Sequence, residues 1–210
     1  MPISWLFSGQ PLFFVVWVAA IIITLTVHEF SHAAVANFFG DKTAKEMGRL
    51  SLNPLVHIDL VGFLMLLFIG FGWAKPVPVN PYNLRKQRLA MGLVSLAGPL
   101  SNLLGVIIFV LVYRLLLPSL GPQNLLIGFF FSLILVNLSL FVFNLIPIPP
   151  LDGSKVLFSL LSDKFADFKY KFETNGPWIL LVLLVADSIL NLGIFNWLFE
   201  LMIKILYYFL

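Results

Sequence analysis

The chain has 210 residues, of which 60% are hydrophobic and 11% are charged, and its mean hydropathy is +1.00. A soluble domain is about 45–50% apolar and about 25% charged, so this composition excludes an ordinary soluble protein and predicts an integral membrane protein. The formal net charge of +3 does not indicate nucleic-acid binding, because no basic stretch alternates with aromatic residues. The absence of cysteine excludes disulfides and thiolate metal ligands.

The first apolar stretch, Leu12–Phe39, is long enough to cross a membrane, because a spanning helix needs about 20 residues. It carries the segment His28-Glu29-Phe30-Ser31-His32. On a helix, two imidazoles four residues apart lie on one face and can bind one zinc ion, and Glu29 can take a proton from water there. The alternative is that these residues occur together by chance or satisfy one another in a helix bundle. Ionisable groups inside a membrane span are costly, which favours the functional interpretation.

The next apolar stretch, Leu60–Trp73, is too short to span the membrane. Its 14 residues would reach roughly 21 Å as a helix, against a hydrocarbon core of about 30 Å. We therefore expect a re-entrant or short β-like segment around residues 50–80. Prolines keep Ala74–Pro81 extended, and Val77–Asn80 could offer an edge on which an unwound substrate pairs as an added strand. The alternative is a plain loop at the membrane surface.

Three further apolar stretches are long enough to span the bilayer: Leu89–Leu117, Leu125–Ile146 and Pro177–Leu210. The last of them is either one long tilted helix or two shorter pieces. In Leu89–Leu117 the small residues Gly98, Ser101 and Gly105 predict close packing against another helix, such as the one that carries the two histidines. The sequence therefore predicts an all-α polytopic membrane protein with about four spanning helices, five or six being the alternatives. We expect residues 1–210 to form one integral membrane domain, with a catalytic core at about 12–160 and C-terminal membrane helices at about 177–210.

Basic residues predict the orientation of these helices. Residues 1–13 and the turn at 118–124 hold no Lys or Arg, whereas residues 40–88 hold seven and residues 147–176 hold four. Loops rich in Lys and Arg stay on the cytoplasmic side. Both basic loops are cytoplasmic if Leu60–Trp73 enters the membrane and returns. The two histidines then lie toward the cytoplasmic side.

Asp152 is the expected third metal ligand, because it arrives at that same side at the end of the Leu125–Ile146 helix. Three nearby prolines deny the backbone its helical hydrogen bonds, and irregular backbone at membrane depth is tolerated only where protein buries it or water fills a cavity. A catalytic zinc site has three protein ligands and an open position for water. The alternative role for Asp152 is to cap a helix over Ser154–Leu161, and Asp187 is a weaker candidate ligand.

These motifs together resemble the site-2 protease family of intramembrane zinc metalloproteases, in its short form without PDZ or CBS domains. The resemblance covers roughly residues 15–160 and rests on four segments: His28–His32, Gly48–Asp59, Ala97–Asn102 and Asn144–Gly153. It implies one zinc ion per chain held by His28, His32 and Asp152, with Glu29 as the catalytic base and Asn144 as the stabiliser of the oxyanion. It also implies a transmembrane protein as substrate, a lipid bilayer as surroundings, and a prokaryotic inner or plasma membrane as location.

Two alternatives remain open at this level. Asn144 could instead bond a neighbouring helix inside the bundle. The whole chain could be a non-catalytic zinc-binding scaffold or regulator, although such a protein has no need of Glu29. The sequence does not indicate an oligomeric state.

Overall fold

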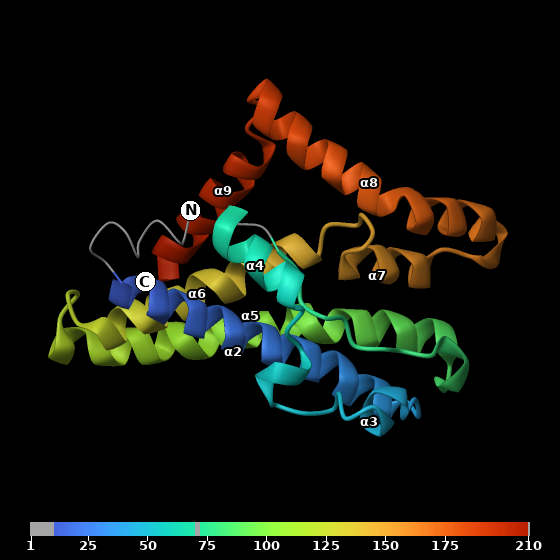
Figure 1. The fold of residues 1–210 in the computed structure, drawn as a ribbon, viewed down its shortest axis with the longest axis horizontal. Helices are drawn as coiled ribbons and strands as arrows, with labels where there is room; N and C mark the ends of the chain where they lie inside the picture. Colours follow the sequence, from blue (N-terminus) through green and yellow to red (C-terminus); the bar gives the residue numbers. More distant parts are fainter. Residues whose placement is uncertain (1–10, 70–71, 210) are drawn as a thin grey trace.

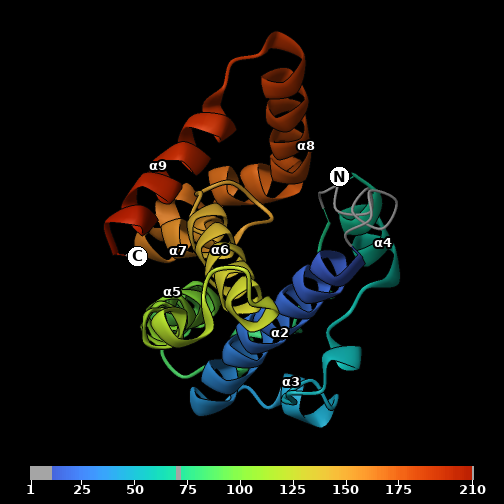
Figure 2. The same ribbon diagram turned by 90° about the vertical axis from the view of Figure 1, so that its left-hand side faces the viewer.

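The computed structural model describes residues 11–69 and 72–209. These residues form helices and loops without a strand, which confirms the all-α prediction. Three of the described helices are long and apolar enough to cross a membrane: α2 (Pro11–Phe38), α5 (Gln87–Leu120) and α6 (Leu125–Asn144). They pack side by side as the core of the molecule (Figures 1 and 2). A helix satisfies its own backbone groups, which is why such apolar sequences become helical in lipid.

A short turn makes α5 and α6 antiparallel neighbours. Gly121 ends α5 with a φ of +76°, a backbone conformation that favours glycine, and its N–H donates to the carbonyl of Leu117 at 2.9 Å. Asn124 begins α6, and its side chain accepts from the N–H of Leu126 at 2.9 Å. Such short connections force adjacent helices to run in opposite directions.

The chain between α2 and α5 contains two short helices, α3 (Thr43–Glu46) and α4 (Leu60–Ile69), and the 3-10 turns η1 (Pro54–Val56) and η2 (Pro81–Asn83). Helix α4 lies within the segment that we expected to be re-entrant. Residues 72–80 have no regular secondary structure, so the expected β-like segment is not a strand here. Its N–H groups bind separate partners instead of a neighbouring strand: Lys75 donates to the His57 carbonyl at 2.8 Å, and Asn80 to Asp41 at 2.7 Å.

The C-terminal region differs from the predicted fourth span. Helix α8 (Ala166–Leu190) begins before Pro177 and includes it, and α9 (Ile194–Phe209) is a separate helix of 16 residues. The break is built by Asn191 in the left-handed conformation and by Asp187, whose carboxylate accepts from the N–H of Ile194 at 2.7 Å. Two pieces were one of the two predicted forms, and neither is among the spans that length and composition identify in the described chain.

Apolar contacts hold the core and attach α9 to it. One buried cluster joins α5, α6 and α9 and consists of Val110, Ile134, Leu138, Met202 and Leu206. A second cluster joins α2, the loop and the start of α5, and consists of Ala36, Leu84, Ala90 and Val94. Between these clusters α2, α5 and α6 bury polar side chains, which a membrane protein does only where they have partners or a function.

Candidate metal centre and active site

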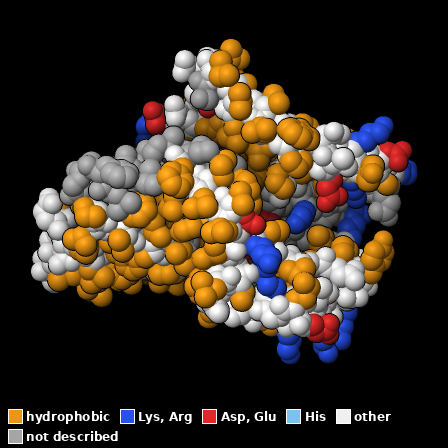
Figure 3. All heavy atoms as spheres, viewed as in Figure 1, with side chains coloured by type: hydrophobic (Ala, Val, Ile, Leu, Met, Phe, Trp, Pro, Cys, Tyr) orange, Lys and Arg blue, Asp and Glu red, His pale blue; other side chains and the backbone are white. Residues whose placement is uncertain are grey.

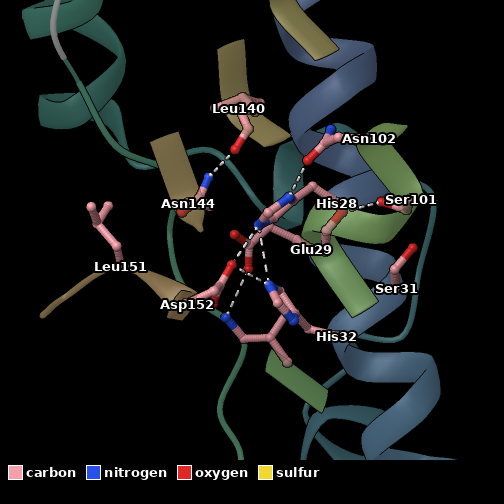
Figure 4. A network of polar contacts seen from close by, with 12 residues as sticks. His28, Glu29, Ser31, His32, Ser101, Asn102, Leu140, Asn144, Leu151 and Asp152 are labelled. Carbon is pink, nitrogen blue, oxygen red and sulfur yellow. Dashed lines mark hydrogen bonds and ion pairs between the residues drawn. The ribbon is translucent and has the colours of Figure 1, made fainter. Parts of the chain in front are cut away.

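Three predicted ligands meet in one place. The Nε2 atoms of His28 and His32 lie 3.1 Å apart, and each lies 3.2 Å from Oδ2 of Asp152. Figure 4 shows the three side chains pointing toward one another from α2 and from the start of α7 (Asp152–Leu160). All three residues are buried.

The positions of these side chains follow from local structure. His28 and His32 lie one helical turn apart on α2 and face α5 at Gly98. A Cβ atom at Gly98 would lie 2.5 Å from His28 Cε1 and 2.5 Å from His32 Nε2, so only glycine leaves room for both rings. The small residues expected to pack helices therefore also make space for the site.

Asp152 is the first residue of α7, and the residue that caps this helix is Leu151. The capping role that the sequence left open for Asp152 is therefore wrong. Helix α7 is also fastened at its other end, where Arg88 of α5 donates to the carbonyls of Ser159 at 2.6 Å and Leu160 at 2.5 Å.

The other nitrogen of each imidazole has an acceptor. His28 Nδ1 lies 2.6 Å from Oδ1 of Asn102, and His32 Nδ1 lies 2.6 Å from the carbonyl oxygen of Val94. Each Nδ1 therefore carries the proton, and each Nε2 offers a lone pair. Two lone pairs and a carboxylate oxygen that converge within 3.2 Å repel one another unless a cation lies among them. Two imidazoles and a carboxylate suit Zn²⁺, so the residues fit a zinc ion.

Glu29 lies beside this group on α2 and is buried. Its Oε2 accepts from the N–H of Val77 at 3.0 Å, so the segment that follows α4 fixes the position of the carboxylate. Glu29, the three predicted ligands and Asn144 all line one cavity of about 380 Å³. Water therefore has room next to the carboxylate.

Asn144 lines the same cavity as the predicted ligands. It ends α6, and its Nδ2 donates to the carbonyl of Leu140, four residues earlier, at 3.1 Å (Figure 4). The bond to a neighbouring helix that we considered as an alternative is not the contact seen; the partner belongs to the same helix.

The sequence did not assign roles to two buried asparagines, Asn102 on α5 and Asn137 on α6. Asn102 Nδ2 donates to Oδ1 of Asn137 at 3.1 Å, and Asn137 Nδ2 donates to Thr24 Oγ1 at 2.9 Å. The signal available in the sequence was an amide in the middle of a nearly uncharged span, because polar groups at that depth need partners.

Comparisons with known proteins agree with this geometry. The family model described as peptidase family M50 matches residues 121–186. The chain is 43% identical, over 80% of its own length and 80% of the relative's, to a Bacillus subtilis (strain 168) protein named "Putative zinc metalloprotease YwhC". It is 33% identical to the "Putative zinc metalloprotease Rip2" of Mycobacterium tuberculosis (strain ATCC 25618 / H37Rv), over 90% of this chain and 74% of Rip2. It is 30% identical to the "Putative zinc metalloprotease MJ0611" of Methanocaldococcus jannaschii, over 75% of this chain and 78% of MJ0611. No solved structure matches the chain.

Proposed function

Because the chain belongs to peptidase family M50 and is a membrane zinc metalloprotease, we propose that it is an intramembrane endopeptidase in which His28, His32 and Asp152 hold the zinc ion and Glu29 is the general base. The observation that carries this proposal is the convergence of three ligand atoms within 3.2 Å, beside a buried carboxylate and a cavity. The reaction is the hydrolysis of a peptide bond in or near a transmembrane segment.

Glu29 is the residue that moves protons in this mechanism. Zinc, when bound, lowers the pKa of a coordinated water to about 7 and so supplies the nucleophile at neutral pH. Glu29 accepts the proton of that water and delivers it to the leaving amine. General acid–base catalysis of this kind typically raises the reaction rate by about 10²–10⁴-fold. The Val77 N–H keeps the Glu29 carboxylate in place during the transfer.

The surroundings of the cavity support a transmembrane segment as substrate. A second cavity of about 420 Å³, lined mostly by apolar side chains of α2, α4, α6 and α9, shares Leu25, Trp73 and Leu140 with the first. An apolar peptide that unwinds near the carboxylate can place neighbouring side chains there. Hydrophobic side chains also cover the outside of the long helices in Figure 3, as lipid contact requires.

We propose that the site opens toward the cytoplasmic side of a prokaryotic cell membrane. On the face drawn in Figure 3, Lys and Arg side chains gather toward the end that holds α3, α7 and the start of α8, while the end that holds the α5–α6 turn shows none on this face. This distribution supports the cytoplasmic orientation, because basic residues favour that side.

The segment Val77–Asn80 is proposed to bind the unwound substrate by strand addition. It is extended, it lies along the cavity, and it has no neighbouring strand in the described chain. Val79→Pro removes one N–H from this edge and should impair cleavage, whereas Val79→Ala should not. Equal cleavage by both variants would show that the segment is a surface loop that does not bind substrate in this way.

Asn144 is proposed to stabilise the oxyanion that forms during attack. Its amide lines the cavity and could exchange the Leu140 carbonyl for the oxyanion. Asn144→Ala should lower kcat by about 10²-fold with zinc still bound. Asn175 is a matched control, because it also donates to the carbonyl four residues earlier, at 2.8 Å, but is exposed on α8. Loss of zinc from Asn144→Ala would make the residue structural.

The first experiment compares wild type with Glu29→Gln in lipid, using membrane-anchored reporter proteins and measuring zinc content in both. We expect cleavage to be lost and zinc to be retained. Glu46→Gln, an exposed acid on α3, is the control that should keep full activity. If neither protein cleaves any reporter while both bind zinc, either the substrate is missing from the panel or the protein is the non-catalytic scaffold, and substrate trapping with Glu29→Gln decides between them. If wild type binds no zinc, the proposed site is wrong.

A further inference from the structure

A chain of buried polar side chains runs from the metal centre into the middle of the helix core. It begins at His28 on α2, passes to Asn102 on α5 and Asn137 on α6, and returns to Thr24 on α2. All four residues are at most 4% exposed. Three helices therefore meet at one continuous set of hydrogen bonds, one end of which is a predicted zinc ligand.

The direction of every bond in this chain is fixed from its far end. Asn137 lies 2.8 Å from the backbone carbonyl of Leu133, which can only accept. The atom of Asn137 at that position must therefore be the amide nitrogen, whose second hydrogen goes to Thr24 Oγ1 at 2.9 Å. Consequently the oxygen of Asn137 faces α5.

The orientation of Asn137 also fixes the orientation of the Asn102 amide. Because Asn137 presents an oxygen, Asn102 must present its nitrogen to it, at 3.1 Å. The oxygen of Asn102 is then left to face His28 Nδ1, at 2.6 Å. An oxygen acceptor at that distance requires a hydrogen on Nδ1, which leaves the lone pair on Nε2, the atom that faces His32 and Asp152.

We propose that Asn102 and Asn137 are positioning residues that hold His28 in the form that binds zinc through Nε2, with the Leu133 carbonyl as the fixed end of the relay. This inference rests on the proposed function, because it takes His28 to be a zinc ligand. The second ligand does not need a relay, since the Val94 carbonyl meets His32 Nδ1 directly. Outer partners of this kind orient ligands and raise their basicity.

Glycine on α5 makes the relay possible. A Cβ atom at Gly105 would lie 2.6 Å from Oδ1 of Asn137 and 3.0 Å from its Cγ. The absence of a side chain at Gly105 therefore lets the Asn137 amide approach α5 closely enough to meet Asn102. Gly98, on the same helix, leaves room for the imidazoles in the same way.

Asn102→Leu is the decisive variant, because it is similar in size and removes both hydrogen bonds. We expect zinc affinity, measured by competition with a chromophoric chelator, to fall about 10–100-fold. Asn102→Asp keeps the acceptor for His28 but sets its second oxygen against the oxygen of Asn137, so it should recover part of that affinity. Asn137→Leu frees the Asn102 amide to turn and should have a smaller effect in the same direction.

Matched threonines on α2 separate the relay from general packing. Thr24 accepts from Asn137, whereas Thr26, also buried, donates to the Ile22 carbonyl of its own helix at 2.6 Å. Because the Leu133 carbonyl still orients Asn137 in Thr24→Val, both Thr24→Val and Thr26→Val should bind zinc more tightly than Asn102→Leu does. A loss of zinc affinity in Thr26→Val as large as that in Asn102→Leu would assign the loss to packing and overturn the relay.

A spectroscopic measurement reports on His28 directly. The chain has three histidines, so imidazole ¹⁵N–¹H spectra of the zinc-loaded protein are simple to assign. We expect Asn102→Leu to shift the Nδ1–H signal of His28 and to leave that of His32 unchanged, while His57, whose Nε2 donates to the Ser51 carbonyl at 2.7 Å, serves as an internal reference.

The outcomes distinguish this inference from the proposed function. If wild type binds no zinc, or if His28→Ala binds it as well as wild type, the proposed metal site fails. If zinc binding depends on His28 but Asn102→Leu changes neither the affinity nor the His28 signal, the relay alone is overturned.

Discussion

The helix core and the C-terminal pair of helices are both rich in apolar residues, but they bury different kinds of side chain. At the centre of α2, α5 and α6 the protein buries Asn102 and Asn137 and the predicted zinc ligands. In the described part of α8 only Gly176 and Leu180 are buried, and in α9 only Met202 and Leu206. Large side chains of these two helices face outward instead; Tyr208, for example, is 87% exposed.

This difference indicates that the two regions have different roles. The core packs tightly around the candidate site, as at Gly98, whereas α8 reaches the site cavity with a single buried side chain, Leu180. Substitutions in the core should therefore act on zinc binding, and substitutions in the C-terminal pair should act on access and substrate binding. The following predictions test this comparison, from the largest expected effect to the smallest.

The largest effect is expected from Asp152→Ala. It removes the carboxylate that meets both imidazoles and should weaken zinc binding by more than about 100-fold, the upper end of the range for outer partners. Zinc titration of the purified protein measures the change. Asp167→Ala, an exposed acid of α8, is the control and should bind zinc as wild type does. A similar loss of zinc affinity in Asp152→Ala and Asp167→Ala would show that the core and the C-terminal helices do not differ in their effect on zinc binding.

The next effect is expected from Gly98→Ala. The added methyl group would overlap both imidazoles, so we expect a destabilisation of about 1–3 kcal/mol together with weaker zinc binding. Thermal unfolding and zinc titration measure the two consequences. Gly128→Ala on α6 is the matched control, because its nearest atom, Phe13 Cε1, lies 3.7 Å away at ordinary contact distance. Unchanged zinc affinity in Gly98→Ala would show that the rings can move aside.

A smaller effect is expected from Gly176→Ala on α8. A Cβ atom there would lie 2.3 Å from Cβ of Pro149, so α8 must shift away from the loop that precedes Asp152. We expect KM to rise while zinc affinity stays the same, because the core is untouched. Kinetics with a cleaved reporter, alongside zinc titration, check this. A loss of zinc would mean that α8 supports the metal centre.

The smallest effect is expected at Asp41, in the loop that covers the core. Burial would raise the pKa of its carboxyl group, but hydrogen bonds from Thr43, Asn80 and Asn83 outweigh burial and lower it below 3.8. A lowered pKa in the folded protein means that the carboxylate stabilises the fold above pH 3.8 and that this stabilisation is lost as the pH falls through the folded value.

Asp41→Asn should therefore cost about 1 kcal/mol at neutral pH. The difference in unfolding temperature from wild type should be constant well above pH 3.8 and should shrink as the pH falls through 3.8 and below it. A difference that is the same at every pH would rule out the charge as its cause. Zinc affinity at neutral pH should not change.

The sequence predicted the parts of the molecule that depend on local pattern. The predicted ends of the Leu125–Ile146 span lie within two residues of α6, and the proline-rich turn indicated Asp152, because breaks in a membrane helix need a reason. The convergence of His28 and His32 could be predicted because the two residues share one helical face.

The rest depends on contacts between segments far apart in the chain. Nothing in the sequence pairs Asn102 with Asn137, 35 residues later, or says that the Val94 carbonyl would meet His32. The start of α8 was missed because Pro177 suggested a helix beginning there. An interior proline costs a helical hydrogen bond and crowds the carbonyl four residues earlier, yet α8 continues through Pro177.

Helix α7 has a consequence for how the site could be altered. Its first residue is Asp152, and Arg88 of α5 holds the carbonyls of Ser159 and Leu160 at its other end, so its nine residues act as a spacer of fixed length and phase. One residue added between these ends would turn Asp152 by about 100° relative to Arg88. An insertion or deletion of a single residue within α7 should therefore carry the Asp152 carboxylate away from His28 and His32, even though neither of those residues is changed.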